Sequence, residues 1–211
     1  MRVAVLFCFI ILVILFQSSC DVCSCKKVPC PAFDNAEFTA WFPYNSNSTI
    51  LFKNNTGVAD TLSIYSVNKS SSYEARKGCY HGDKGCNTDG SIYATLKHSA
   101  NANTAVDFNF RTLTAFESST PAKNLALSFG SFNIQATDLG TNGLVNITTV
   151  NYSASFHSQL TLNNTTFSNV QQIVKDTLSS KQAGIYKLYL SRNEGIIAYE
   201  QYPSQTIWIK Q

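Results

Sequence analysis

The chain has 211 residues, a net charge of +3 and only 14% charged side chains. Its Lys and Arg residues are scattered, and the absence of a basic stripe argues against a nucleic-acid-binding protein. Ser, Thr and Asn are abundant, and aromatic and β-branched residues are common, which is typical of an exported, β-rich protein.

The first element is an apolar leader. Arg2 is followed by an unbroken apolar run over residues 3–16. The run is shorter than the about 20 apolar residues that span a bilayer, and it fits the apolar part of a secretory signal peptide. A buried core helix is the alternative, which the lack of any polar face disfavours. We expect residues 1–19 to be a signal peptide that is cleaved on export.

The leader ends in the sequence FQSSC at residues 16–20, which resembles the lipobox of bacterial lipoproteins. This resemblance implies that Cys20 receives a diacylglyceryl thioether, becomes the mature N-terminus and holds the protein on a membrane, most simply the outer membrane. Two or three acyl chains would anchor it almost permanently. Gln17 departs from the pattern, which usually has Leu there. The alternative is ordinary cleavage, which would leave a secreted soluble protein.

After the leader, residues 20–36 are expected to form a lipid-anchored, Cys-rich tether, stiffened by two prolines. Disulfides are the default outside the cytoplasm, and the candidates are Cys23, Cys25, Cys30, Cys79 and Cys86. Cys79 and Cys86 are close in sequence, so a bridge between them is favoured, with a stabilisation of about 2–3 kcal/mol. If Cys20 carries lipid, one of the five thiols has no partner within the chain. A metal site formed by Cys23, Cys25 and Cys30 is the alternative; it is disfavoured because no His lies near this cluster and these three cysteines include no C-x-x-C pair.

From residue 37 to residue 211 we expect a single β-rich domain. Strands are predicted at residues 38–42, 49–53, 62–67, 92–97, 105–110, 125–136, 144–149, 152–162, 186–190, 197–199 and 207–209. In the strand at 105–110, apolar and polar residues alternate as in a half-buried strand. Turn signals occur at residues 54–57, 88–90, 141–143 and 192–195.

Two segments allow alternatives. Residues 132–136 would continue the strand at 125 through a bulge at Gly130, and residues 165–177 fit either a helix or a strand. No long helix is predicted after the leader. The predicted fold is therefore mainly β, an antiparallel meander that forms a curved sheet, an open barrel or a sandwich.

Three pieces of the domain resemble a widespread class of small, uncharacterised lipoproteins of Gram-negative bacterial envelopes. These pieces are CPAFD at 30–34 with WFPY at 41–44, TFSNV at 166–170, and KLYLS at 187–191 with EGIIAY at 194–199 and Trp208. The resemblance implies a lipid-anchored, mainly β envelope protein and carries no catalytic information.

The sequence has no G-x-S-x-G, H-E-x-x-H, G-x-x-x-x-G-K or G-x-G-x-x-G motif. Its histidines, His81, His98 and His157, stand far apart. Residues 83–90 superficially resemble a calcium loop, but Gly85 and Leu96 would occupy ligand positions that need carboxylates. We therefore expect no metal, no cofactor and no enzymatic activity.

Several N-x-S/T sequons occur, including those at Asn47, Asn54, Asn146, Asn151 and Asn163. Given the lipobox-like leader, these are interpreted as chance matches in an Asn- and Thr-rich surface and not as glycosylation sites.

The sequence thus predicts a non-enzymatic binding or structural module of the cell envelope. Its partner would be a protein, a glycan or an apolar ligand that contacts the sheet or its loops. The alternatives are a carrier of an apolar ligand and an envelope hydrolase whose site is assembled from distant residues such as Asp107, Glu117 and His157.

Overall fold

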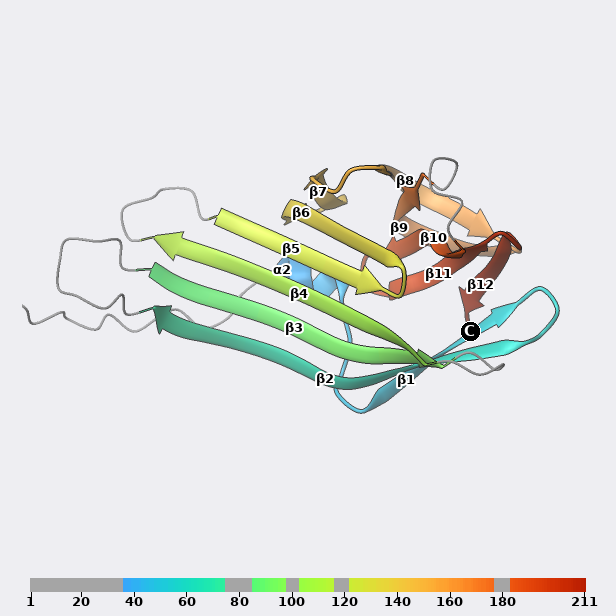
Figure 1. Cartoon of the computed structure of the whole chain (residues 1–211), viewed down its shortest axis with the longest axis horizontal. Coiled ribbons are helices and arrows are strands. Elements are labelled where there is room, and N and C mark those ends of the chain that lie inside the picture. The colour runs from blue at the N-terminus through green and yellow to red at the C-terminus, as the bar shows by residue number, and fades with distance from the viewer. Residues whose placement is uncertain (1–35, 75–84, 98–102, 116–121, 177–182) are drawn as a thin grey trace, which may run out of the picture.

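The computed structural model describes residues 36–74, 85–97, 103–115, 122–176 and 183–211. Its twelve strands form one antiparallel sheet in the order β7-β6-β5-β4-β3-β2-β1-β12-β11-β10-β9-β8. The sheet is curved into a nearly closed barrel (Figure 1). The mainly β, antiparallel meander predicted from the sequence is therefore confirmed.

The first half of the sheet and its short helix comprise α2 (Ala36–Trp41), β1 (Ser48–Asn54), β2 (Ala59–Glu74), β3 (Gly85–Lys97), β4 (Asn103–Ala115), β5 (Ala122–Phe129), β6 (Phe132–Gly140) and β7 (Gly143–Ile147). The second half comprises β8 (Tyr152–Leu162), β9 (Thr165–Lys175), β10 (Gly184–Ser191), β11 (Gly195–Tyr202) and β12 (Thr206–Lys210). Figure 1 shows β2–β5 as a long layer, and β8–β12 are gathered at the right-hand end of the view. The first and last strands, β1 and β12, pair in the middle of the sheet. The two edge strands are β7 and β8, which are consecutive in the sequence.

Helix α2 fills the interior where a strand was predicted. Phe38, Trp41 and Phe42 are all 0% exposed. Their spacing of i, i+3 and i+4 places them on one face of a helix, whereas a strand would put Trp41 and Phe42 on opposite faces. The indole Nε1 of Trp41 donates a hydrogen bond of 2.9 Å to the carbonyl of Gly140. The strand prediction at residues 38–42 is therefore wrong.

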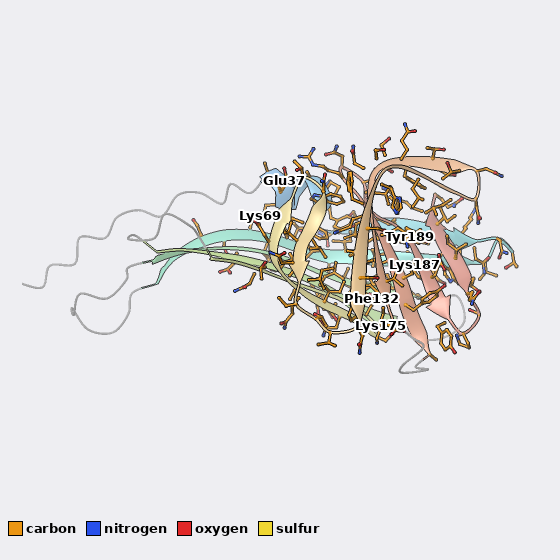
Figure 2. The ribbon with its side chains drawn as sticks, turned by 90° about the horizontal axis from the view of Figure 1, so that it is seen from above. Glu37, Lys69, Phe132, Lys175, Lys187 and Tyr189 are labelled. Atoms are coloured by element: carbon orange, nitrogen blue, oxygen red, sulfur yellow. The ribbon has the colours of Figure 1, made fainter. Side chains whose placement is uncertain are left out.

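The helix is also tied to both halves of the sheet. The Arg192 guanidinium forms an ion pair with Glu37 at 3.0 Å, and the backbone N–H of Asn193 donates to the carbonyl of Ala40. The Nζ of Lys69 on β2 donates to Thr39 at 3.0 Å. Figure 2 labels Glu37 and Lys69, which lie close to each other beside the helix.

A side chain of β9 joins the edge strand β7 to the second half of the sheet. The Gln171 Oε1 atom accepts a hydrogen bond of 2.8 Å from the Leu144 N–H, and its Nε2 donates to the Leu144 carbonyl at 3.0 Å. This amide supplies the pair of bonds that a neighbouring strand would supply to β7. Gly143 makes the approach possible, because a Cβ there would lie 2.2 Å from Oε1 of Gln171.

Further contacts join the β5–β6 hairpin to the second half. The Tyr152 hydroxyl accepts a bond of 3.0 Å from the Asn133 N–H, and the rings of Tyr152 and Phe132 meet edge to face at 5.0 Å. The Nζ of Lys175 donates to the Ser131 carbonyl at 3.1 Å. Figure 2 labels Phe132 and Lys175 in this region.

The second half of the sheet has an apolar cluster on each face. Leu188, Leu190 and Trp208 belong to the large interior core. The alternating residues on the other face form a second cluster, here called the outer cluster, with members Leu160, Leu162, Phe167, Val170, Tyr189, Ile197, Ala198, Ile207 and Ile209. Its members come from all five strands of this half, β8–β12.

Three further sequence predictions are settled by the strands. Residues 85–97 form one strand, so the turn predicted at 88–90 is wrong; the backbone there pairs with both β2 and β4. Gly130 has φ +62° and lies in the turn between β5 and β6, so the predicted bulge is a hairpin. The segment that fitted helix or strand is strand β9.

Asparagine occupies many of the left-handed backbone positions. Positive φ values occur at Asn47, Asn146, Asn151, Asn163, Asn164, Asn169 and Asn193. Asn tolerates this conformation better than other non-glycine residues. All the sequon asparagines named above except Asn54 are in this list, so turn geometry gives a physical reason for their presence.

Candidate functional site

A groove with a volume of about 680 Å³ lies over β3, β5 and β6. Leu125 and Ala136 point into the core, so their neighbours along β5 and β6 point outward. The hydrogen-bonding side chains of the lining are Asp89, Ser91, Asn124, Gln135, Thr137 and Thr148. The volume falls in the range typical of small-molecule sites.

The sheet register brings these residues together from distant parts of the sequence. Ser91 pairs with residue 109 on β4, which pairs with Ala126 on β5, which in turn pairs with Gln135 on β6. Three strand spacings of about 4.8 Å separate Ser91 from Gln135, so this row is about 14 Å wide. The neighbouring row carries Asp89, Asn124 and Thr137 by the same register.

The described lining is suited to hydrogen bonding. Its amides and hydroxyls can each donate and accept, while Asp89 is the only ionisable group among the lining residues that the structure describes. Glycoside hydrolysis, for comparison, uses two carboxyl groups about 5–9 Å apart. The groove as described can therefore hold a polar ligand but does not present a pair of catalytic carboxylates.

A second polar cluster surrounds Glu200 on β11. Its carboxylate accepts hydrogen bonds from Tyr186, from Tyr189 at 2.6 Å and from the Lys187 Nζ at 3.0 Å. The Glu200 side chain is 12% exposed. Figure 2 labels Lys187 and Tyr189 in the half of the sheet that holds β8–β12.

Titration of this Glu200 cluster follows from those contacts. Burial alone would raise the pKa of Glu200, but the hydrogen bonds from Tyr186, Tyr189 and Lys187 outweigh burial and lower the pKa below its ordinary value. Burial, followed by the bond to Glu200, raises the pKa values of both tyrosines. The carboxylate is held ionised with three donors, so the cluster is built as a structural clamp and not as a proton acceptor.

A buried pair lies inside the barrel. The Tyr199 hydroxyl donates a bond of 2.6 Å to Oδ2 of Asp60, and both residues are 0% exposed. Burial, and then the bond to Asp60, raise the pKa of Tyr199. The rings of Phe52 and Phe129 meet Tyr199 edge to face at 5.4 Å and 5.3 Å. This pair is therefore part of the packed interior.

The residues of the hydrolase hypothesis are not brought together where the structure describes them. Asp107 on β4 pairs with Tyr93 and Ser128. His157 on β8 pairs with Val170, and its Nε2 lies 3.1 Å from the Ser155 hydroxyl. Strands β4 and β8 are not neighbours in the sheet. Glu117, His81 and His98 lie outside the described residues.

The cysteine predictions fall largely outside the described residues. These include Cys20, Cys23, Cys25, Cys30 and Cys79. The backbone of Cys86 lies on β3 opposite residues 73 and 114. The lipidation of Cys20 and every proposed disulfide stay predictions.

Two features are absent from the described residues, a metal-binding cluster and a membrane-spanning helix. These residues contain no group of three or more His, Cys, Asp and Glu side chains placed to hold a metal ion. Within the same residues, no helix has both the length and the apolar character that crossing a membrane requires. The part of the calcium-like segment that is described, Gly85 to Gly90, belongs to strand β3 and is not a loop.

Sequence reasoning missed the groove. Its described residues come from β3, β5 and β6 and from Thr148, just after β7. Strand β4 separates β3 from β5, and the polar members look like ordinary outward-facing strand residues. Their alternation with Leu125 and Ala136 shows that their side chains point away from the core. Only the register between the strands shows that they lie side by side.

Comparison with known proteins adds no relative: no family model, no curated protein and no solved structure matches the chain. The resemblance to envelope lipoproteins therefore depends on the sequence motifs alone.

Proposed function

We propose that this chain is a lipid-anchored cell-envelope protein that binds a polar organic ligand in the groove over β3, β5 and β6 and releases it unchanged. The observation that carries the proposal is the groove itself, a space of about 680 Å³ with six hydrogen-bonding side chains among the described residues of its walls. Pockets of this size with a few convergent polar groups are the usual place for ligand binding.

The filled interior favours this proposal over a carrier of an apolar ligand. A carrier barrel would need an empty apolar lumen, and here Phe38 and Trp41 of α2 and the following Phe42 are packed among the core side chains with no exposure. The groove lies on the opposite, outward face of the strands. Its amides and hydroxyls would lose hydrogen bonds to water without replacement if an apolar molecule covered them.

The chemistry of the described residues favours binding over hydrolysis. Glu200 is saturated by three donors, and Asp60 is buried against Tyr199. Asp89 stands as a single carboxylate in the described lining. We therefore infer a binding module, with an envelope hydrolase as the alternative.

The anchor is proposed from the FQSSC sequence at residues 16–20. Cells expressing the full chain would be labelled with palmitate. Wild type and Cys23→Ala, the matched control, should be labelled and pellet with membranes, while Cys20→Ala should be unlabelled. Unlabelled wild-type protein in the soluble fraction would contradict the anchor.

The groove would be tested with the full-length protein in detergent. The probes are soluble neutral oligosaccharides, nucleosides and amino acids, and binding is measured by calorimetry. The double variant Asn124→Ala/Gln135→Ala should weaken binding of that probe by about fivefold or more, since each lost hydrogen bond contributes about 0.5–1.5 kcal/mol. Gln159→Ala, an exposed amide on β8, is the matched control.

The same samples separate the alternatives. Equal binding by the groove variant and the control would reject the groove as the site. If chromatography shows that the wild-type protein converts a bound probe chemically, the hydrolase alternative is favoured.

A further inference from the structure

A pair of tyrosines lies on the outer face of β2 and β3. Tyr65 is 52% exposed and Tyr93 is 48% exposed. Their ring centroids are 5.8 Å apart and their planes are inclined by 33°. Large aromatic side chains normally bury most of their area, so two neighbouring rings with about half of their surface in water form a distinct feature.

The pair is held in place. The Thr95 hydroxyl on β3 donates a hydrogen bond of 3.1 Å to the Tyr65 hydroxyl. Tyr65 lies at a register shift between β2 and β3, where Ile64 pairs with Ala94 and Ser66 pairs with Tyr93. The extra residue on β2 places the Tyr65 ring next to Tyr93, and the two rings make a shallow plate (called the tyrosine plate below).

The tyrosine plate adjoins the groove. Tyr93, Ser91 and Asp89 follow one another at every second position of β3, so they share its outer face. Tyr93 and Ser91 are therefore about 7 Å apart along the strand. Ser91 and Asp89 line the groove, so one surface runs from the two exposed rings to the polar lining.

We propose that the ligand is a neutral oligosaccharide, with one sugar ring stacked on the tyrosine plate and the following sugars hydrogen-bonded in the groove. This inference rests on the proposed function of the groove. The apolar face of a sugar presents C–H groups to the negative face of an aromatic ring. Its hydroxyls match amides and hydroxyls that both donate and accept. The spacing between plate and groove requires at least two linked sugars.

Other ligand classes fit this surface less well. A peptide that adds to a sheet needs the unpaired backbone of an edge strand, but β3 pairs with β2 and β4 along its length. A single nucleobase or a free amino acid is too short to reach from the plate to Gln135.

The test uses cello-, chito- and malto-oligosaccharides of increasing length, titrated calorimetrically into the full-length protein in detergent. Affinity should rise with length in at least one series and then level off. Tyr93→Ala should lower the affinity for the longest member by about tenfold, which is within the range of stacking on aromatic side chains. Tyr93→Phe keeps the ring and should stay within about twofold of wild type.

Phe156→Ala is the matched control, because Phe156 is an aromatic residue 37% exposed on β8. Its affinities should equal those of wild type at every length. The corresponding monosaccharide, which is too short to reach from the groove to the tyrosine plate, should bind Tyr93→Ala as tightly as wild type. Circular dichroism of each variant shows that the fold is kept.

The outcomes distinguish this inference from the function on which it rests. If another polar probe binds in the groove and no oligosaccharide does, the inference is overturned and the groove function stands. If oligosaccharides bind with equal affinity to wild type and Tyr93→Ala, the tyrosine plate is not part of the site. If binding depends on Tyr93 but not on Asn124 and Gln135, the groove assignment fails instead.

Discussion

The two halves of the sheet differ in how they use their outer faces. On β10–β12 that face is buried in the outer cluster, where Ile197 is 0% exposed and Ile209 is 5% exposed. On β3 and β5 the same face carries Tyr93 and Asn124, which are open to solvent. Strands that are packed on both sides have little freedom to rearrange. The comparison suggests that the second half is a stable base and that the first half offers the binding surface.

The largest expected effect tests this difference directly. Ile197→Ala removes a fully buried side chain from the outer cluster and should lower the free energy of unfolding by about 2–4 kcal/mol. Tyr93→Ala, on the outer face of the first half, should change it by no more than about 0.5 kcal/mol. Urea denaturation monitored by tryptophan fluorescence measures both. Equal losses from the two variants would remove the distinction between the halves.

The second prediction concerns the junction between the halves. Gly143→Ala would place a Cβ 2.2 Å from the Gln171 amide and strain a backbone with φ +94°. Displacing that amide leaves the buried N–H and carbonyl of Leu144 without partners, so we expect a loss of about 2–3 kcal/mol in unfolding free energy.

Gly57→Ala is the matched control for this change. Gly57 also has a positive φ, +83°, but nothing lies within 4 Å of an added Cβ. Gly57→Ala should therefore lower the unfolding free energy only by the backbone strain, about 1 kcal/mol. If the two substitutions cost the same in urea denaturation, the Gln171 amide does not hold the junction closed.

These cases also show what the sequence could predict. Alternation along single strands, as at Leu125, Leu127 and Phe129, gave the fold class because period 2 is a local property. The helix at Phe38 and Trp41 was missed, since six residues give too little periodicity to separate a helix from a strand.

The site was harder to predict than the fold. The groove, the closure by Gln171 and the contact between Tyr65 and Tyr93 all depend on the register between strands. Two neighbouring strands of the groove, β5 and β6, form a simple hairpin, but β3 is separated from them by β4. The register shift beside Tyr65 has no clear local signal. Long-range pairing of this kind is set by the whole sheet and is not visible in any one segment.

The third prediction concerns the Glu200 cluster of the second half. Glu200→Gln removes the charge that Lys187, Tyr186 and Tyr189 stabilise, and should lower the unfolding free energy near neutral pH by about 1–2 kcal/mol. Glu194→Gln is the control, because Glu194 is 43% exposed and its contact with Lys210 is 3.8 Å long. We expect that control to stay within about 0.5 kcal/mol of wild type.

The pH dependence of this effect has a definite sign. The pKa of Glu200 in the folded protein lies below its ordinary value of 4.5. Its contribution to stability is therefore complete above that value and is lost as the pH falls through the folded pKa. The difference between wild type and Glu200→Gln should shrink on acidification in urea denaturation. A difference that grows at acid pH would mean that the carboxylate is not stabilised by its three donors.

The smallest expected effect concerns Asn151, in the connection between the two halves. Its φ of +68° is left-handed, and its carbonyl accepts a bond of 2.7 Å from the Asp176 N–H. Asn151→Gly keeps this conformation without strain, so the unfolding free energy should change by no more than about 0.5 kcal/mol. Asn151→Ala should cost about 1 kcal/mol. Thermal unfolding of the two variants shows which is the more stable. Equal midpoints would show that the turn relaxes to a different backbone conformation. In that case the two halves are less firmly joined at Asn151 than at Gly143.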